Sequence, residues 1–140
     1  MNITFSKSIA AAILFSFLAP ALALAKPEEE AQKAAEQWLA LADTGDFSGS
    51  WNTAAGYFKA AVSSEQWQQS LNAVRKPLGD LVSRKLKNAT YTRTLPGAPD
   101  GEYVVLQFET SFANKKTAVE TVTPMLDKDG KWRVSGYYIK

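Results

Sequence analysis

The spacing of apolar residues changes near Gly79, and this change limits the folds that the chain can adopt. Before Gly79, apolar residues recur three and four positions apart, which is typical of helices with one buried face. After Gly79, apolar and polar residues alternate, which is typical of strands with one buried face. Helices followed by an antiparallel meander predict an α+β domain with its helices packed on one face of the sheet.

The helical part begins with a clear start signal. Pro27 lacks only an N–H that the first helical turn would leave unpaired, and the acidic residues 28–30 face the positive end of the helix dipole. An apolar stripe follows at helical spacing, and Gly45 is expected to end the helix. The sequence therefore predicts a first helix from Pro27 to just before Gly45.

Two further helices are predicted before the sheet. The second should begin near residues 48–50 and continue to Phe58 along one apolar face. The third begins with a capping box formed by Ser63 and Gln66 and closes at residues 75–77. The helical part is thus expected to contain three helices.

Four strands are predicted after Gly79, over residues 82–93, 102–112, 117–126 and 132–139. The second has the clearest alternation, with Val104, Leu106 and Phe108 on one face. Prolines and glycines in residues 95–101 predict a stiff loop between the first two strands, and residues 127–130 predict a tight turn between the last two.

The first 25 residues have the pattern of a signal peptide. Lys7 supplies the positive charge, residues 9–18 form a short apolar segment, and the Ala-Leu-Ala at 23–25 matches a cleavage site. The apolar segment is shorter than the roughly 20 residues that a membrane span needs. We therefore expect cleavage after Ala25, a single domain over residues 26–140 without a transmembrane span, and location in the periplasm or the extracellular medium.

Composition excludes several classes of function. The chain contains no Cys and no His, so it has no disulfide, no Cys/His zinc site, no thiol nucleophile and no Ser-His-Asp triad. Its 16 basic residues nearly balance 14 acidic ones, which argues against a dedicated nucleic-acid-binding protein. No other pattern indicates a metal or cofactor, and we expect neither.

Long segments resemble one exported bacterial family. Four segments look like the family called domain of unknown function 4019. They are AAEQWLALADTGDFSGSW at 34–51, VRKPLG at 74–79, LPGAPDGEYVVLQFETSF at 95–112 and ETVTPMLDKDGKWRVSGYYI at 120–139. The resemblance implies a cone-shaped fold similar to nuclear-transport-factor-2-like and cystatin-like domains, with three N-terminal helices on one face of a curved four-stranded antiparallel sheet. The family implies no established activity, so no catalytic residue carries over.

Five residues are candidates for a ligand site: Arg84, Tyr103, Glu109, Glu120 and Trp132. A carboxylate base beside a tyrosine can catalyse enolisation or dehydration, and Glu109 or Glu120 could supply the carboxylate. The alternative is that these carboxylates face solvent or pair across strands. Arg84 is in phase with apolar residues of its strand, so burial of that face would require a carboxylate partner such as Glu120. Trp132 opens the last strand, where it could line a pocket mouth or pack in the core.

A basic cluster is the main charge asymmetry; it comprises Arg75, Lys76, Arg84, Lys85 and Lys87. It could bind an anionic ligand, although Arg75 and Lys76 also suit a helix C-terminus and the two later lysines could protect an edge strand.

Three functions therefore remain open. The first is a non-catalytic module that binds a small apolar or amphipathic ligand, or a protein partner. The second is a cofactor-free lyase or isomerase, and the third is association with anionic envelope components through the basic cluster. A homodimer through the outer sheet face, with Tyr103, Val105 and Tyr137, is also compatible with the sequence.

Overall fold

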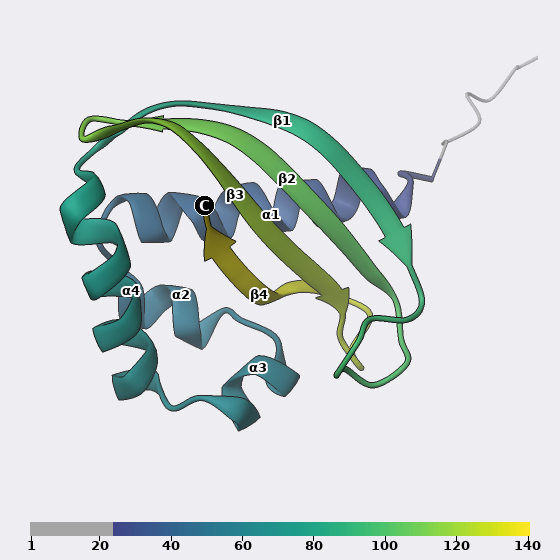
Figure 1. Cartoon of the computed structure of the whole chain (residues 1–140). Helices are drawn as coiled ribbons and strands as arrows, with labels where there is room; N and C mark the ends of the chain where they lie inside the picture. Colours follow the sequence, from purple (N-terminus) through teal and green to yellow (C-terminus); the bar gives the residue numbers. More distant parts are fainter. Residues whose placement is uncertain (1–23) are drawn as a thin grey trace, which may run out of the picture.

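A computed structural model describes residues 24–140 (Figure 1). The predicted signal peptide lies outside the described residues, apart from Leu24 and Ala25. The elements follow the order α1 (Pro27–Asp43), α2 (Phe47–Asn52), α3 (Gly56–Ala61), α4 (Ser64–Leu78), β1 (Leu81–Thr92), β2 (Tyr103–Phe112), β3 (Lys115–Leu126) and β4 (Trp132–Ile139). Helices followed by strands confirm the α+β class, and among residues 24–140 no helix is long and apolar enough to cross a membrane.

The first helix forms as its sequence predicts. Pro27 occupies the first turn beside three glutamates, and the helix ends at Asp43. Gly45 follows with φ +81°, a conformation that costs glycine little because it has no Cβ. The inward face of α1 carries small residues and two large ones, Trp38 and Leu39, so α1 lies close against the sheet.

The prediction of three helices was wrong, because the second predicted helix is two short helices. Asp46 caps α2 by accepting a hydrogen bond from the Gly49 N–H at 2.9 Å. Between α2 and α3, the Ala55 N–H donates instead to the Val134 carbonyl of β4 at 2.8 Å. This contact with a strand 79 positions later in the chain replaces a helical hydrogen bond, so the helix is interrupted there.

The capping box of α4 is present in full. The Gln66 N–H donates to Ser63 Oγ, and the Ser63 N–H donates to Gln66 Oε1, both at 3.2 Å. The helix continues through Pro77 to Leu78, slightly beyond the predicted end.

Replacing Ser63 by alanine should lower the free energy of unfolding by about 1 kcal/mol, because one helix-terminal N–H then loses its partner. Urea denaturation of the two proteins measures the difference. Replacing the neighbouring Ser64 is the control, since its hydroxyl accepts only a side-chain hydrogen bond, from Gln68. Equal losses in the two variants would show that the cap contributes no stability of its own.

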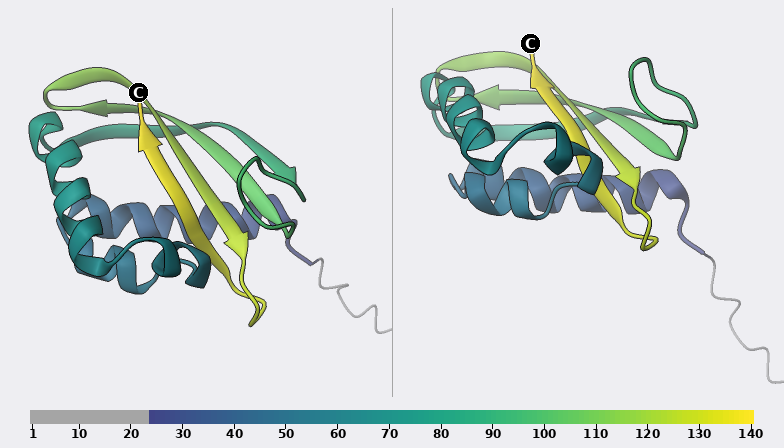
Figure 2. Two further views of the ribbon diagram at one scale, coloured as in Figure 1. Left: turned by 60° about the horizontal axis from the view of Figure 1, so that its bottom comes forward. Right: turned by 90° about the horizontal axis from the view of Figure 1, so that it is seen from below.

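The four strands form one antiparallel meander in the order β1-β2-β3-β4. Register shifts interrupt the pairing of β1 with β2 at two places, of β2 with β3 at one, and of β3 with β4 at one. Such irregularities increase strand twist and bend, and the sheet curves over α1 while α4 stands at the end that carries the β2–β3 hairpin (Figures 1 and 2).

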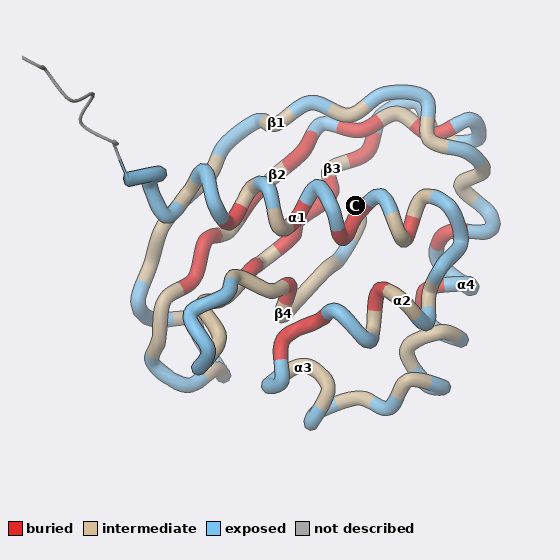
Figure 3. Tube along the Cα trace, turned by 180° about the vertical axis from the view of Figure 1, so that it is seen from behind, coloured by how far each residue is buried: buried red, intermediate tan, exposed pale blue. Residues whose placement is uncertain are grey.

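The core lies between the concave sheet face and α1 (Figure 3). The alternation predicted for β2 is confirmed, because Val104, Leu106 and Phe108 are all buried. Trp38 is central: its ring packs against Trp67 and Tyr137, with centroids 6.0 and 5.1 Å away. Because side chains fill the middle of the concave face, open space for a ligand has to lie at its margins.

Candidate functional site

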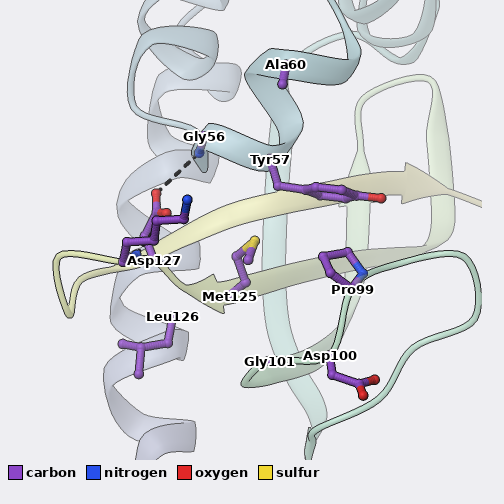
Figure 4. Close-up of a pocket in the computed structure, with 10 residues that line it drawn as sticks. Gly56, Tyr57, Ala60, Pro99, Asp100, Gly101, Met125, Leu126 and Asp127 are labelled. Atoms are coloured by element: carbon purple, nitrogen blue, oxygen red, sulfur yellow. Dashed lines mark hydrogen bonds between the residues drawn. The ribbon is translucent and has the colours of Figure 1, made fainter.

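A pocket of about 660 Å³ lies where three segments meet at the end of the sheet, and we call it the strand-end pocket (Figure 4). The segments are α3, the loop between β1 and β2, and the end of β3 with the turn that follows. The pocket is lined by Gly56, Tyr57, Ala60, Pro99, Asp100, Gly101, Met125, Leu126, Asp127 and Lys128. Residues about 70 positions apart in the sequence thus share one cavity.

Hydrogen bonds hold the three segments in place. The Gly56 N–H donates to Asp127 Oδ2 at 3.2 Å, which joins α3 to the β3–β4 turn. The Tyr57 hydroxyl donates to the Gly97 carbonyl at 3.1 Å, which joins α3 to the β1–β2 loop. Tyr103 donates to the Pro99 carbonyl at 2.6 Å from beneath the same loop. The pocket walls are therefore fixed by specific polar contacts.

The pocket surface is mostly apolar. Tyr57 and Met125 present their side chains toward it, and Asp100 lies at its margin (Figure 4). The Gly56 N–H is the main cause that lowers the pKa of Asp127, and Lys128 N–H and Arg133 add to it. Asp127 therefore serves as an ionised hydrogen-bond acceptor. An apolar cavity with a few polar groups suits ligand binding.

A separate set of buried charges lies between α1, α4 and the sheet. Glu120 has 0% exposure and accepts hydrogen bonds from Arg84 Nε at 2.7 Å and from Thr110 Oγ1 at 2.6 Å. The Tyr137 hydroxyl donates to its second oxygen. The predicted pairing of Arg84 with Glu120 is confirmed, and burial of that strand face is the reason for it.

Asp43 extends these charges into a network. Its two oxygens accept from Arg84 Nη1 and Nη2 at 2.7 and 2.9 Å, and Oδ1 also accepts from Arg75 Nη2 at 2.8 Å. We call Asp43, Arg75, Arg84 and Glu120, with Thr110 and Tyr137, the ion network. Its two carboxylates balance its two guanidinium groups, which reduces the cost of burying them.

The network shifts the protonation equilibria of its members. Burial raises the pKa of Asp43, but hydrogen bonds from Arg84 and Arg75 outweigh burial and hold it below its ordinary value of 3.8. Burial and then the charge of Glu120 raise the pKa of Tyr137 well above its ordinary value, so Tyr137 stays protonated and donates. Glu120 already accepts from three donors and has no exposed surface, which does not favour a role as a substrate-facing base.

The lowered pKa of Asp43 predicts a dependence of stability on pH. Its contribution is fully present above the unfolded value of about 3.8 and is lost as pH falls through the lower folded pKa. The difference in unfolding free energy between the wild type and Asp43→Asn should therefore shrink as pH falls from about 6 to about 3. Urea denaturation at each pH measures it. A difference that is constant over this range would contradict the role of the ionised carboxylate.

The other predicted site residues lie apart from one another. Glu109 is exposed on the outer sheet face, opposite Lys85 in the strand register. Trp132 is half-buried and lines a hollow of about 210 Å³ between α1 and β4. Tyr103 is buried under the β1–β2 loop and supports the strand-end pocket from behind. Of the five candidates, only Arg84 and Glu120 contact each other.

Two surface interpretations need correction. Arg75 is buried and Arg84 is mostly buried in the ion network, so the predicted basic cluster is not a continuous surface. Tyr137 lies on the concave face against Trp38, and Tyr103 is 1% exposed, so neither is available on the outer face for a dimer contact. The fold turns Arg75, Arg84 and Tyr137 inward, and the β1–β2 loop covers Tyr103.

The residues that form the strand-end pocket, above all Tyr57 and Met125, were not predicted from the sequence. A partial signal existed in the Pro- and Gly-rich loop at 95–101, since stiff loops position binding residues. Nothing in the sequence indicated that α3 would lie against that loop.

The family model described as "Protein of unknown function (DUF4019)" matches residues 34–137, well over half of the chain. No curated protein and no solved structure matches the chain.

Proposed function

The chain belongs to the DUF4019 family, and we propose that it is an exported, non-catalytic module that binds a small apolar or amphipathic ligand in the strand-end pocket. One observation carries this proposal: a cavity of about 660 Å³ with mostly apolar walls, held by three interelement hydrogen bonds. Typical ligand pockets measure about 300–1,000 Å³ and combine apolar walls with a few polar groups. A pocket held in place before binding loses less entropy when the ligand enters.

The curved sheet over α1 supports a likeness to nuclear-transport-factor-2-like and cystatin-like cones, which we include in the proposal. Such cones hold ligands in different ways, so the likeness by itself does not identify one. Export is likewise part of the proposal. It predicts that protein recovered from the exported fraction begins at Lys26, which intact-mass measurement tests.

Filling the pocket should abolish binding of an apolar probe. Ala60 is exposed on α3 and its side chain points into the strand-end pocket (Figure 4), so Ala60→Trp adds a large ring there without disturbing the core. The probe is N-phenyl-1-naphthylamine, whose fluorescence rises in apolar surroundings. We expect saturable binding to the wild type and an affinity at least about tenfold lower in the variant, a difference of about 1.4 kcal/mol.

The matched control is Ala61→Trp, which adds the same ring at the next exposed position, outside the pocket lining. Binding should remain within about twofold of the wild type. NMR of the Met125 methyl group reports whether the probe occupies the strand-end pocket. Binding that both variants reduce equally, or that leaves the Met125 signal unchanged, would reject the proposal. Native mass spectrometry of the exported protein then gives the mass of any natural ligand.

A further inference from the structure

The last part of β4 has an unpaired edge. Val119 and Lys140 exchange both backbone hydrogen bonds, each at 3.0 Å. Hydrogen-bonded and non-hydrogen-bonded positions alternate along an antiparallel ladder. Tyr138, like Lys140, therefore directs its backbone N–H and C=O groups toward β3, whereas Tyr137 and Ile139 direct theirs away from it. Among residues 24–140, no backbone group bonds these outward groups of Tyr137 and Ile139.

The other edges of the sheet are protected. Earlier in β4, the outward carbonyl of Val134 is taken by Ala55. The opposite edge, β1, has two register shifts and carries Lys85 and Lys87, devices that discourage pairing with another strand. Residues 134–139 of β4 contain no charge, and the ammonium group of Lys140, which follows them, lies over the Tyr138 ring at 5.9 Å from its centroid. The end of β4 is therefore the part of the sheet best suited to accept another strand.

An apolar groove of about 280 Å³ runs beside this edge, and we call it the edge groove. It is lined by Trp67, Ser70, Leu71 and Val74 of α4 and by Tyr137, Tyr138 and Ile139 of β4. Val74 is 47% exposed and Tyr138 is 51% exposed, large fractions for apolar residues at one site. A strand paired with β4 would place every second side chain against this groove.

We propose that the edge groove binds an extended, uncharged segment of a partner protein, which adds to the sheet as a fifth strand with apolar side chains at alternate positions. The outward groups of Tyr137 and Ile139 form hydrogen bonds with a strand backbone, and the groove selects apolar side chains. A second copy fits less well. The free edge is about four residues or 13 Å long, too short for the roughly 1,200–2,000 Å² that a stable dimer buries.

The test uses the peptide acetyl-SVTVTVS-amide as the probe and NMR of the full domain as the readout. We expect the backbone amides of Tyr137 and Ile139 to shift on titration. Val74→Glu puts a charge into the groove from an exposed position, and Ile139→Pro removes one outward N–H without breaking a bond to β3. Each should weaken binding by about tenfold or more.

Val82→Glu is the matched control, since it introduces the same charge at an exposed valine on the opposite edge, β1. It should leave the affinity for the peptide unchanged. Ala60→Trp in the strand-end pocket should also leave that affinity unchanged, so the proposals for the edge groove and for the strand-end pocket can fail independently. A peptide with N-methyl groups on its β4-facing amides should not bind. The proposal would be overturned if about 1 mM peptide caused no amide shifts, or if Val82→Glu weakened peptide binding as much as Val74→Glu does. It would also be overturned if the protein self-associated and Val74→Glu abolished that self-association.

Discussion

Replacing Arg84 by methionine should lower the free energy of unfolding by about 3–5 kcal/mol, the usual cost of breaking a buried ion pair. Arg84 is 12% exposed and donates to both Glu120 and Asp43, so its removal leaves the buried Glu120 without an ion-pair partner and leaves the partly buried Asp43 with Arg75 alone. Domains of this size have a total stability of about 5–15 kcal/mol. Guanidinium denaturation should show a clearly lower midpoint with an unchanged slope.

Two comparisons make this result specific to the ion network. Arg93→Met makes the same substitution at an exposed arginine just after β1 and should change stability by no more than about 0.5 kcal/mol. Combining Arg84→Met with Glu120→Gln should recover part of the loss, because Glu120 is then neutral and Asp43 keeps Arg75 as its partner, so no carboxylate of the ion network is left unpaired. If the double variant is less stable than Arg84→Met, the unpaired charge of Glu120 is not the cause.

Replacing Trp38 by alanine should also cost about 3–5 kcal/mol, because it removes a large ring from a filled core. Trp38 is 3% exposed, packs on Trp67 and Tyr137, and donates from Nε1 to the Ser50 carbonyl at 2.8 Å. It therefore joins α1 to α2, α4 and the sheet. Thermal unfolding followed by circular dichroism measures the loss.

The control is Trp132→Ala, which removes the same ring from a half-buried position at the start of β4. Its cost in unfolding free energy should be clearly smaller. The half-buried Trp132 ring removes less apolar surface from water on folding than the buried Trp38 ring does, so less stabilisation is lost with it. Equal losses at the two positions would contradict the central place of Trp38 in the core.

Local signals explain why much of the fold was predictable. The start of α1, the capping box of α4 and the alternation in β2 depend on residues within one turn or one strand. The pairing of Arg84 with Glu120 was also predictable in kind, since a buried arginine needs an acidic partner. Asp43 was not predicted, because its position near Arg84 depends on how α1 crosses the sheet.

The split of the second predicted helix shows the limit of local signals. Residues 48–58 have helical spacing, yet the Ala55 N–H bonds to β4. A hydrogen bond to a distant strand stabilises a break that the local pattern does not encode, since tertiary contacts override weak helix propensity.

The sequence by itself determined the order of helices and strands, the inward faces of the long elements and the chemistries that a chain without Cys or His cannot perform. These properties depend on residue types and on spacings within a few positions. Only the tertiary structure decided that α3 meets the β1–β2 loop to form the strand-end pocket and that Arg75 and Arg84 of the basic cluster pair with carboxylates in the ion network. It also decided that, among residues 24–140, the outer edge of the last part of β4 has no backbone partner. Those outcomes depend on contacts between residues tens of positions apart, whose positions are fixed only when the whole core packs.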